Sequence, residues 1–159
     1  MRITVNTSGN SLADLIRRKP EEFRRQTDRA AGRGALELAR AVREKAPKAD
    51  STLANTVQVQ KLGVGYRRVI VGAAYGRPVE EGADPGGFPP ERAIEDWIQV
   101  RGIEPHDPEM TREDLAYVIA RSIFQEGTEP QPFFAPAWEE NKDRIQRRLD
   151  GAVERVMQA

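Results

Sequence analysis

The residues best suited to metal or acid–base chemistry lie around His106, the one histidine of the chain. In the segment GIEPHDPEM it is surrounded by Glu104, Asp107 and Glu109, and an imidazole with carboxylates could hold a hard metal ion. A single histidine with scattered carboxylates between two prolines is, however, more typical of a polar loop. We therefore expect no metal site and no cofactor here.

Other kinds of catalysis find little support in the sequence. The chain has 0 Cys, which excludes a thiol nucleophile, and a Ser–His–Asp arrangement would have only one histidine available. GVG and GADPGG contain glycines, but neither matches a phosphate-binding loop. No carboxylate pair among the 25 acidic residues is singled out by spacing. We predict that the chain is not an enzyme, and a small hydrolase using carboxylates stays as an alternative.

Composition predicts one domain with a thin core and a heavily charged surface. The chain has 159 residues, of which 38% are hydrophobic and 31% charged. No apolar run is long enough to span a membrane, and the first residues, MRITVNTSGNSLADL, lack the apolar region of a signal peptide. We expect folding in a cytoplasm without disulfides and no membrane partner.

Net charge is zero, but the two signs divide along the chain. Up to Arg68 there are 15 Lys and Arg against 7 Asp and Glu (+8), and from Val69 onward 10 against 18 (−8). Either these halves pair within one monomer, or they form opposite faces suited to head-to-tail association. A candidate basic surface is formed by Arg17, Arg18, Lys19, Arg24, Arg25 and Arg29. Such a surface could contact backbone phosphates of nucleic acid in a salt-dependent way.

Helical patterns dominate the first third of the chain. MRITVNTSG alternates and predicts a short strand or extended arm. The capping-box form SLAD at residues 11–14 predicts one or two helical turns that end near Lys19. A long helix should follow, because Pro20 suits its first position, apolar residues recur every three or four positions, and Pro47 stops the run. Its apolar positions are mostly alanine, which permits close approach of another element.

The middle of the chain changes period. Val57 and Val59 alternate with glutamines, glycines punctuate a turn, and residues 67–71 resume the apolar run, which predicts a β-hairpin. PPERAIEDWIQVRG and TREDLAYVIARSIF predict two shorter helices, the second opening with a capping box. Their expected apolar faces are Ile94, Trp97 and Ile98 on the first, and Leu115, Val118, Ile119, Ser122 and Ile123 on the second.

The order of elements indicates a single α+β domain over residues 1–159. We expect a long N-terminal helix, a small antiparallel β-sheet or hairpin, an inserted helical pair and a C-terminal helix from about Pro136 to Met157. The divisions are 1–19 (arm and short helix), 20–82 (helix plus hairpin), 83–126 (helical insertion) and 127–159 (Pro-Phe loop and last helix).

A repeated motif flanks the two shorter helices. EGADPGGF (residues 81–88) and EGTEPQPF (residues 126–133) share the pattern E-G-[AT]-[DE]-P-x-x-F. Two copies are too few for a solenoid, so we interpret them as two arms of one turn with a helical excursion between them. The second copy opens into an aromatic loop, where we expect one of Phe133 and Phe134 to point inward and the other toward a neighbouring subunit.

Three segments in this order resemble the tail-completion or minor tail-component family of long-tailed bacteriophages: AVREKAPKADSTLANTVQV, VIVGAAYGRPVEEG and GTEPQPFFAPAWEE. The matching residues are Lys45-Ala46-Pro47, Leu53, Thr56-Val57, Tyr75, Val79, Glu80, Gly82, Gly127-Thr128 and Pro132-Phe133-Phe134-Ala135-Pro136-Ala137. Ser51 departs from the family's glycine. In shorter relatives the E-x-G-T part and the Pro-Phe part of the pattern are nearly contiguous, whereas here residues 83–126 separate them. The resemblance spans about residues 20–155.

The resemblance implies a structural virion protein of the phage neck, which completes or terminates the tail and joins it to the head. It implies a hexameric ring of copies of the chain, contacts with other neck and tail proteins, proximity to DNA in the lumen, and a location in the virion after assembly in the host cytoplasm. The alternative is a nucleic-acid-binding or packaging-associated phage protein using its basic half. The candidate interface residues are Tyr75, Glu80, Gly82, Phe88, Gly127, Thr128, Pro132, Phe133, Phe134, Pro136 and Trp138.

Overall fold

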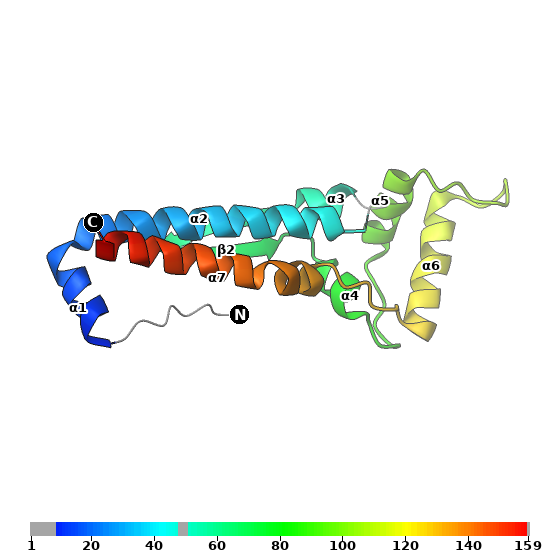
Figure 1. The fold of residues 1–159 in the computed structure, drawn as a ribbon. Helices are drawn as coiled ribbons and strands as arrows, with labels where there is room; N and C mark the ends of the chain where they lie inside the picture. The colour runs from blue at the N-terminus through cyan, green and yellow to red at the C-terminus, as the bar shows by residue number, and fades with distance from the viewer. Residues whose placement is uncertain (1–8, 48–50, 159) are drawn as a thin grey trace.

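Two long helices and a β-hairpin form the body of the molecule, and a pair of shorter helices extends from one end (Figure 1). The computed structural model describes residues 9–47 and 51–158. The elements in this part are α1 (Gly9–Arg18), α2 (Pro20–Lys45), α3 (Ser51–Asn55), β1 (Val57–Gly63), β2 (Tyr66–Val71), α4 (Gly76–Glu81), α5 (Glu91–Arg101), α6 (Arg112–Glu126) and α7 (Phe134–Gln158). The predicted α+β class is confirmed.

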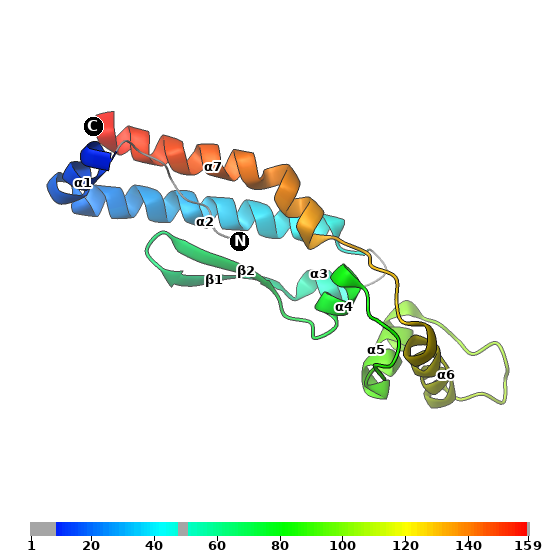
Figure 2. The same ribbon diagram turned by 90° about the horizontal axis from the view of Figure 1, so that it is seen from below.

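α2 is the central layer of the body. α7 lies along one side of it and the hairpin of β1 and β2 along the other (Figure 2). The helices run antiparallel, because Lys45 near the end of α2 forms an ion pair of 2.7 Å with Glu140 near the start of α7. The main core joins all three layers and consists of Leu38, Ala39, Val42, Ala46, Leu53, Val57, Phe133, Ala137 and Ile145.

Small residues bring α2 and α7 close together. Ala30 and Ala39 are buried, and so is Gly34. A Cβ added at Gly34 would lie 3.0 Å from Cγ2 of Ile145, which is tighter than ordinary van der Waals contact. The alanine-rich stripe that the sequence places on the first long helix is therefore the seam against α7.

The hairpin is fastened to α2 at both of its ends. At the turn, Asp28 accepts a hydrogen bond from the Gly65 N–H (3.0 Å) and pairs with Lys61 (3.0 Å) and Arg67 (2.8 Å). At the base, Arg43 donates to the Val57 carbonyl at 2.6 Å. These polar contacts fix the sheet's position over the helix, while the apolar faces of the strands supply the burial.

The inserted helical pair, α5 and α6, has a small core of its own. Ile98, Ala116 and Ala120 are fully buried there, outside the main core. The predicted apolar face of α6 is partly wrong, since Val118 is 50% exposed. The buried residues of α6 are Ala116 and Ala120, each two positions from Val118. Their small side chains let α5 approach closely.

The sequence locates most helix ends correctly. α6 has the predicted capping box, with the Asp114 N–H donating to the Thr111 hydroxyl and the Thr111 N–H donating to the Asp114 carboxylate. Gly102 ends α5 in the left-handed conformation. α1 begins at Gly9, two residues before the predicted start, and the strand or arm expected for residues 1–8 lies outside the described residues. The short helices α3 and α4 were not predicted.

Replacing each α2 glycine by alanine should separate helix propensity from packing. Gly32→Ala should raise the free energy of unfolding by about 0.5–1 kcal/mol, because alanine is the better helix former and the nearest atoms to a new Cβ are 3.9 Å away. Gly34→Ala should leave the unfolding free energy unchanged or lower it, because the new Cβ would lie 3.0 Å from Cγ2 of Ile145 and that side chain must shift. Urea denaturation measures both, and equal stabilisation by the two variants would contradict the close seam.

Acid should loosen the hairpin through Asp28. The Gly65 N–H, then Lys61 and Arg67, lower the pKa of this carboxyl from 3.8 to about 2. A lowered pKa means that its contribution to stability is present above pH 3.8 and is lost as the pH falls through about 2. The difference in unfolding free energy between wild type and Asp28→Asn should narrow over that range in denaturation experiments. A difference independent of pH between 6 and 2.5 would contradict this role.

Candidate functional site

The two copies of the repeated motif cross and pair with each other. Ala83 of the first copy and Thr128 of the second form an antiparallel bridge. The Ala83 N–H donates to the Thr128 carbonyl at 3.1 Å, and the Thr128 N–H donates to the Ala83 carbonyl at 2.8 Å. The chain therefore leaves the body and returns to it at one point, which we call the loop crossing (residues 79–88 and 124–133).

The loop crossing has a local two-fold symmetry. Advancing by 45 residues converts the first motif copy into the second. The Gly86 N–H donates to the Phe124 carbonyl at 2.7 Å, and at the equivalent place the Gln131 N–H donates to the Val79 carbonyl at 2.8 Å. Each copy thus makes the same backbone contacts to the other, which explains why the motif occurs twice.

The glycine of each motif copy is required by the crossing. Gly82 and Gly127 have φ of +77° and +76°, a region that side chains other than glycine rarely adopt. A Cβ at Gly82 would lie 2.7 Å from the Thr128 carbonyl oxygen, and one at Gly127 would lie 2.2 Å from that of Ala83. Either addition would push the paired backbones apart.

Glu80, in α4, caps the start of α7. Its carboxylate accepts hydrogen bonds from the N–H groups of Phe133, Phe134 and Ala135, each at 2.8 Å. The next residue, Pro136, has no N–H. A helix start leaves four backbone donors unpaired and favours a nearby negative charge. This one carboxylate therefore satisfies every N–H of the first turn.

Several of the predicted interface residues are used inside the molecule. Phe133 is 1% exposed and belongs to the main core, against which Tyr75, Phe134 and Trp138 pack. Phe133 therefore has the inward position expected of one ring. Contact of Phe134 with a neighbouring subunit stays a prediction. Of the two predicted prolines nearby, Pro132 is exposed and Pro136 is half-buried.

Phe88, the counterpart of Phe133 in the first motif copy, is exposed to solvent. Its ring centroid is 6.2 Å from that of Tyr117 and 6.0 Å from that of Phe124. The three rings are between 42% and 49% exposed, and Val118 lies on the same helix as the last two. We call Phe88, Tyr117 and Phe124 the aromatic patch. Two of its members were not among the predicted site residues.

The predicted basic surface is partly neutralised. Arg24 pairs with Glu21 at 3.2 Å, and Arg25 pairs with Glu22. Arg29 has no acidic partner within 4.0 Å among the described residues. The remaining residues, Arg17, Arg18 and Lys19, are exposed on α1 and at the junction with α2. The structure thus brings these residues to one end of the molecule, where α1 meets α2.

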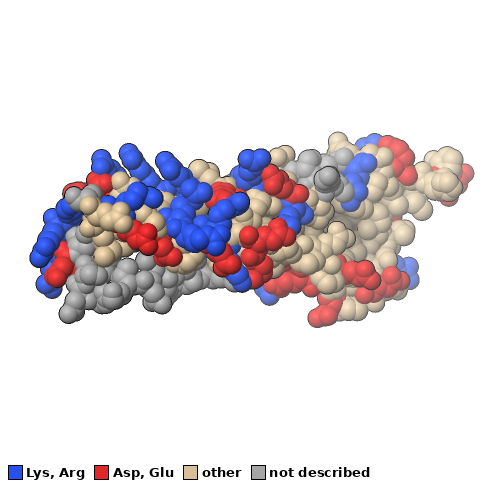
Figure 3. Space-filling view, viewed as in Figure 1, with Lys and Arg blue, Asp and Glu red and all other residues tan. Residues whose placement is uncertain are grey.

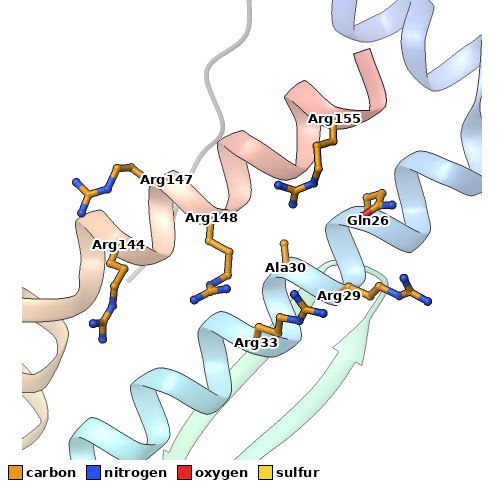
Figure 4. A pocket seen from close by; sticks show the side chains of 8 residues that line it. All are labelled: Gln26, Arg29, Ala30, Arg33, Arg144, Arg147, Arg148 and Arg155. Atoms are coloured by element: carbon orange, nitrogen blue, oxygen red, sulfur yellow. The ribbon is translucent and has the colours of Figure 1, made fainter. Parts of the chain in front are cut away.

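The sequence analysis missed a denser basic site between α2 and α7. A groove of about 440 Å³ is lined by Gln26, Arg29, Ala30, Arg33, Arg144, Arg147, Arg148 and Arg155 (Figure 4). We call it the arginine groove. The spacing of Arg144, Arg148 and Arg155 by four and seven residues puts them on one helical face, a signal that the sequence contained. Their meeting with Arg29 and Arg33 follows only from the antiparallel packing.

The excess of acidic residues lies in one structural part of the molecule and is not spread over the second half of the sequence. Residues 76–129 contain 5 Lys and Arg and 13 Asp and Glu (5 − 13 = −8), and the rest of the chain contains 20 and 12 (20 − 12 = +8). The segment from 130 onward has 5 of each sign. The excess negative charge of the second half therefore lies in the insertion together with α4. Figure 3 shows most Lys and Arg over the α1 and α2 end.

Comparison with known proteins identifies no relative. No family model, curated protein or solved structure matches this chain. Within the described residues, no three acidic or histidine side chains are grouped so that they could hold a metal ion, and His106 is exposed between α5 and α6. No helix in that part has the length and apolar character needed to cross a bilayer.

Removing the Glu80 carboxylate should destabilise the fold. Glu80→Ala leaves three N–H groups at a half-buried helix start without their acceptor, so we expect a loss of about 2–3 kcal/mol in unfolding free energy. Glu80→Gln should lose less, because its amide oxygen still accepts. The matched control is Glu81→Ala, which breaks only an exposed pair with Arg77 and should cost less than about 0.5 kcal/mol. Equal losses for Glu80→Ala and Glu81→Ala would contradict the capping role.

Proposed function

We propose that this chain is a structural subunit of the neck of a long-tailed bacteriophage, where it completes or terminates the tail and joins it to the head. The observation that carries the proposal is the contact between Glu80 and the start of α7. It unites the Tyr75 to Gly82 segment and the Pro132 to Ala137 segment, two parts of the resemblance that are separated by the 49 residues 83–131. The fold thus joins what the insertion separates in sequence.

The matching positions also share one core. Ala46, Leu53, Val57, Phe133 and Ala137 come from five different elements or loops and belong to a single buried cluster. Burial of these apolar residues is compatible with the resemblance, which requires the end of α2 and the start of α7 to lie in one core.

The two ends of the molecule suit head-to-tail association of copies. One end carries the basic residues of α1 and α2, and the other carries the acidic insertion with the aromatic patch (Figures 1 and 3). Contacts between unlike surfaces are heterologous, and they close into a ring when the rotation between copies allows. A ring is the arrangement that fits the rotational axis of a tail. Exposed aromatic rings are also residues that interfaces favour.

The proposal places the chain in the virion, at the neck, after assembly in the host cytoplasm. Its partners there are copies of itself and other neck and tail proteins. The aromatic patch would face one of these partners, whereas Phe133 holds the subunit together.

Deleting the gene from its phage or prophage should test the proposal directly. We expect unjoined heads and tails in electron micrographs of the lysate, with normal virions restored by a plasmid copy. Tails incubated with the purified, gold-labelled protein should carry the label at one end. Intact infectious virions produced without the gene would overturn the proposal.

The aromatic patch should matter for assembly and not for folding. Phe88→Ser removes a ring that is 47% exposed, so its melting temperature should stay near that of wild type while head–tail joining falls. Leu36→Ser is the matched control, because Leu36 is an apolar residue of α2 that is 61% exposed and lies outside the patch. Full complementation by Phe88→Ser would exclude the patch from the interface.

A further inference from the structure

The arginine groove contains far more positive than negative charge. Six arginines line it, and Glu37 is the acidic residue that pairs with two of them, Arg144 and Arg148 (3.0 Å for the latter). Four have no acidic partner within 4.0 Å among the described residues: Arg29, Arg33, Arg147 and Arg155. Guanidinium groups stay charged in proteins, so they cannot relieve their repulsion by losing protons.

Three of the arginines are directed so that an anion could meet them together, whereas Arg147 points away from the groove (Figure 4). Arg33 extends from α2, and Arg148 and Arg155 from α7, into the space between the two helices (Figure 4). Arg148 also has a buried Nε atom with no hydrogen-bond partner in the described part of the chain. This atom is closed off from the groove, so the preference for an occupant rich in acceptor oxygens rests on the charge.

The size of the groove limits what that occupant can be. The groove has a volume of about 440 Å³ and is open on one side, so a long occupant can continue beyond it. The helices α5 and α6 each carry three acidic and two basic residues, so either helix of a second copy would bring little net negative charge to the groove. A sugar–phosphate strand is thin and carries one charge per nucleotide, and arginine forks bind phosphate oxygens in pairs.

We infer that the arginine groove binds the phosphate backbone of a nucleic-acid strand. The groove runs between the antiparallel helices and is open to solvent, so a strand could lie along it with successive phosphates against Arg33, Arg148 and Arg155. Contacts to phosphate oxygens carry no sequence information, so binding in this mode is independent of base sequence. This site differs from the predicted basic surface, with which it shares only Arg29, and it does not depend on the proposed neck function.

Fluorescence anisotropy with labelled 20-nucleotide single strands and 20-base-pair duplexes of two unrelated sequences tests the site. With about three phosphates neutralised, the logarithm of the association constant should fall against the logarithm of salt concentration with a slope of about −2.1 for single strands and about −2.7 for duplexes. The double variant Arg33→Gln/Arg155→Gln should bind about tenfold or more weakly. Its slope should be smaller in magnitude by about 1.4–1.8.

The matched control is Arg40→Gln/Arg77→Gln, which removes the same charge from two exposed arginines that pair with Glu44 and Glu81 outside the groove. Its binding should stay within about twofold of wild type, and melting curves should show all variants folded. Equal weakening by both double variants, or the absence of salt-dependent binding in wild type, overturns the site. So does tripolyphosphate binding as tightly as the oligonucleotide. Light scattering tests whether the groove instead binds a second copy of the chain. If wild type binds no nucleic acid and the groove variant changes its oligomeric state, the groove is an interface between copies, and the nucleic-acid site is overturned as well.

Discussion

The carboxylate of Glu80 is the contact on which the arrangement of this fold depends. α7 supplies one side of the main core, yet it is joined to the rest of the body through the long insertion and not through a tight turn. Its start must therefore be located by a contact across the chain. Three backbone N–H groups that converge on one carboxylate, followed by a proline that has no N–H, define both where the helix begins and how it is directed. Phe133 is then held at the end of the core and the rest of α7 follows along α2.

The loop crossing explains how the body tolerates an insertion. The chain leaves and returns through backbone pairs related by a local two-fold symmetry, so the ends of the insertion are held together whatever lies between them. The symmetry stops at the aromatic residues. Phe133 enters the main core, whereas Phe88 contacts Tyr117 and Phe124 on the outside. Equivalent motifs thus serve different purposes, because only one of them is followed by a helix that packs on the body.

The sequence predicted those features that depend on neighbouring residues. The capping box at Thr111, the proline at the start of α2 and the alternation from Val57 each act within a few residues, and the structure contains all three. α3 and α4 are one to two turns long, too short for a periodic signal. The role of Glu80 could not be foreseen, because its partners lie 53 to 55 residues away. For the same reason, counting charge by halves hid the arginines of α7, which fold back beside those of α2.

The close seam between α2 and α7 and the arginine groove are two consequences of the same packing. Gly34, Ala30 and Ala39 let the helix axes approach, and arginines at the rims of so narrow a seam are brought within reach of each other. Larger seam residues would separate the helices and dilute the positive charge. Burial of Ala152, Val153 and Val156 holds this end of α7 in place despite the repulsion. The apolar contacts thus supply the stability that lets Arg33, Arg148 and Arg155 share the space between the two helices (Figure 4). The anion site that we infer there would therefore be formed before the anion binds.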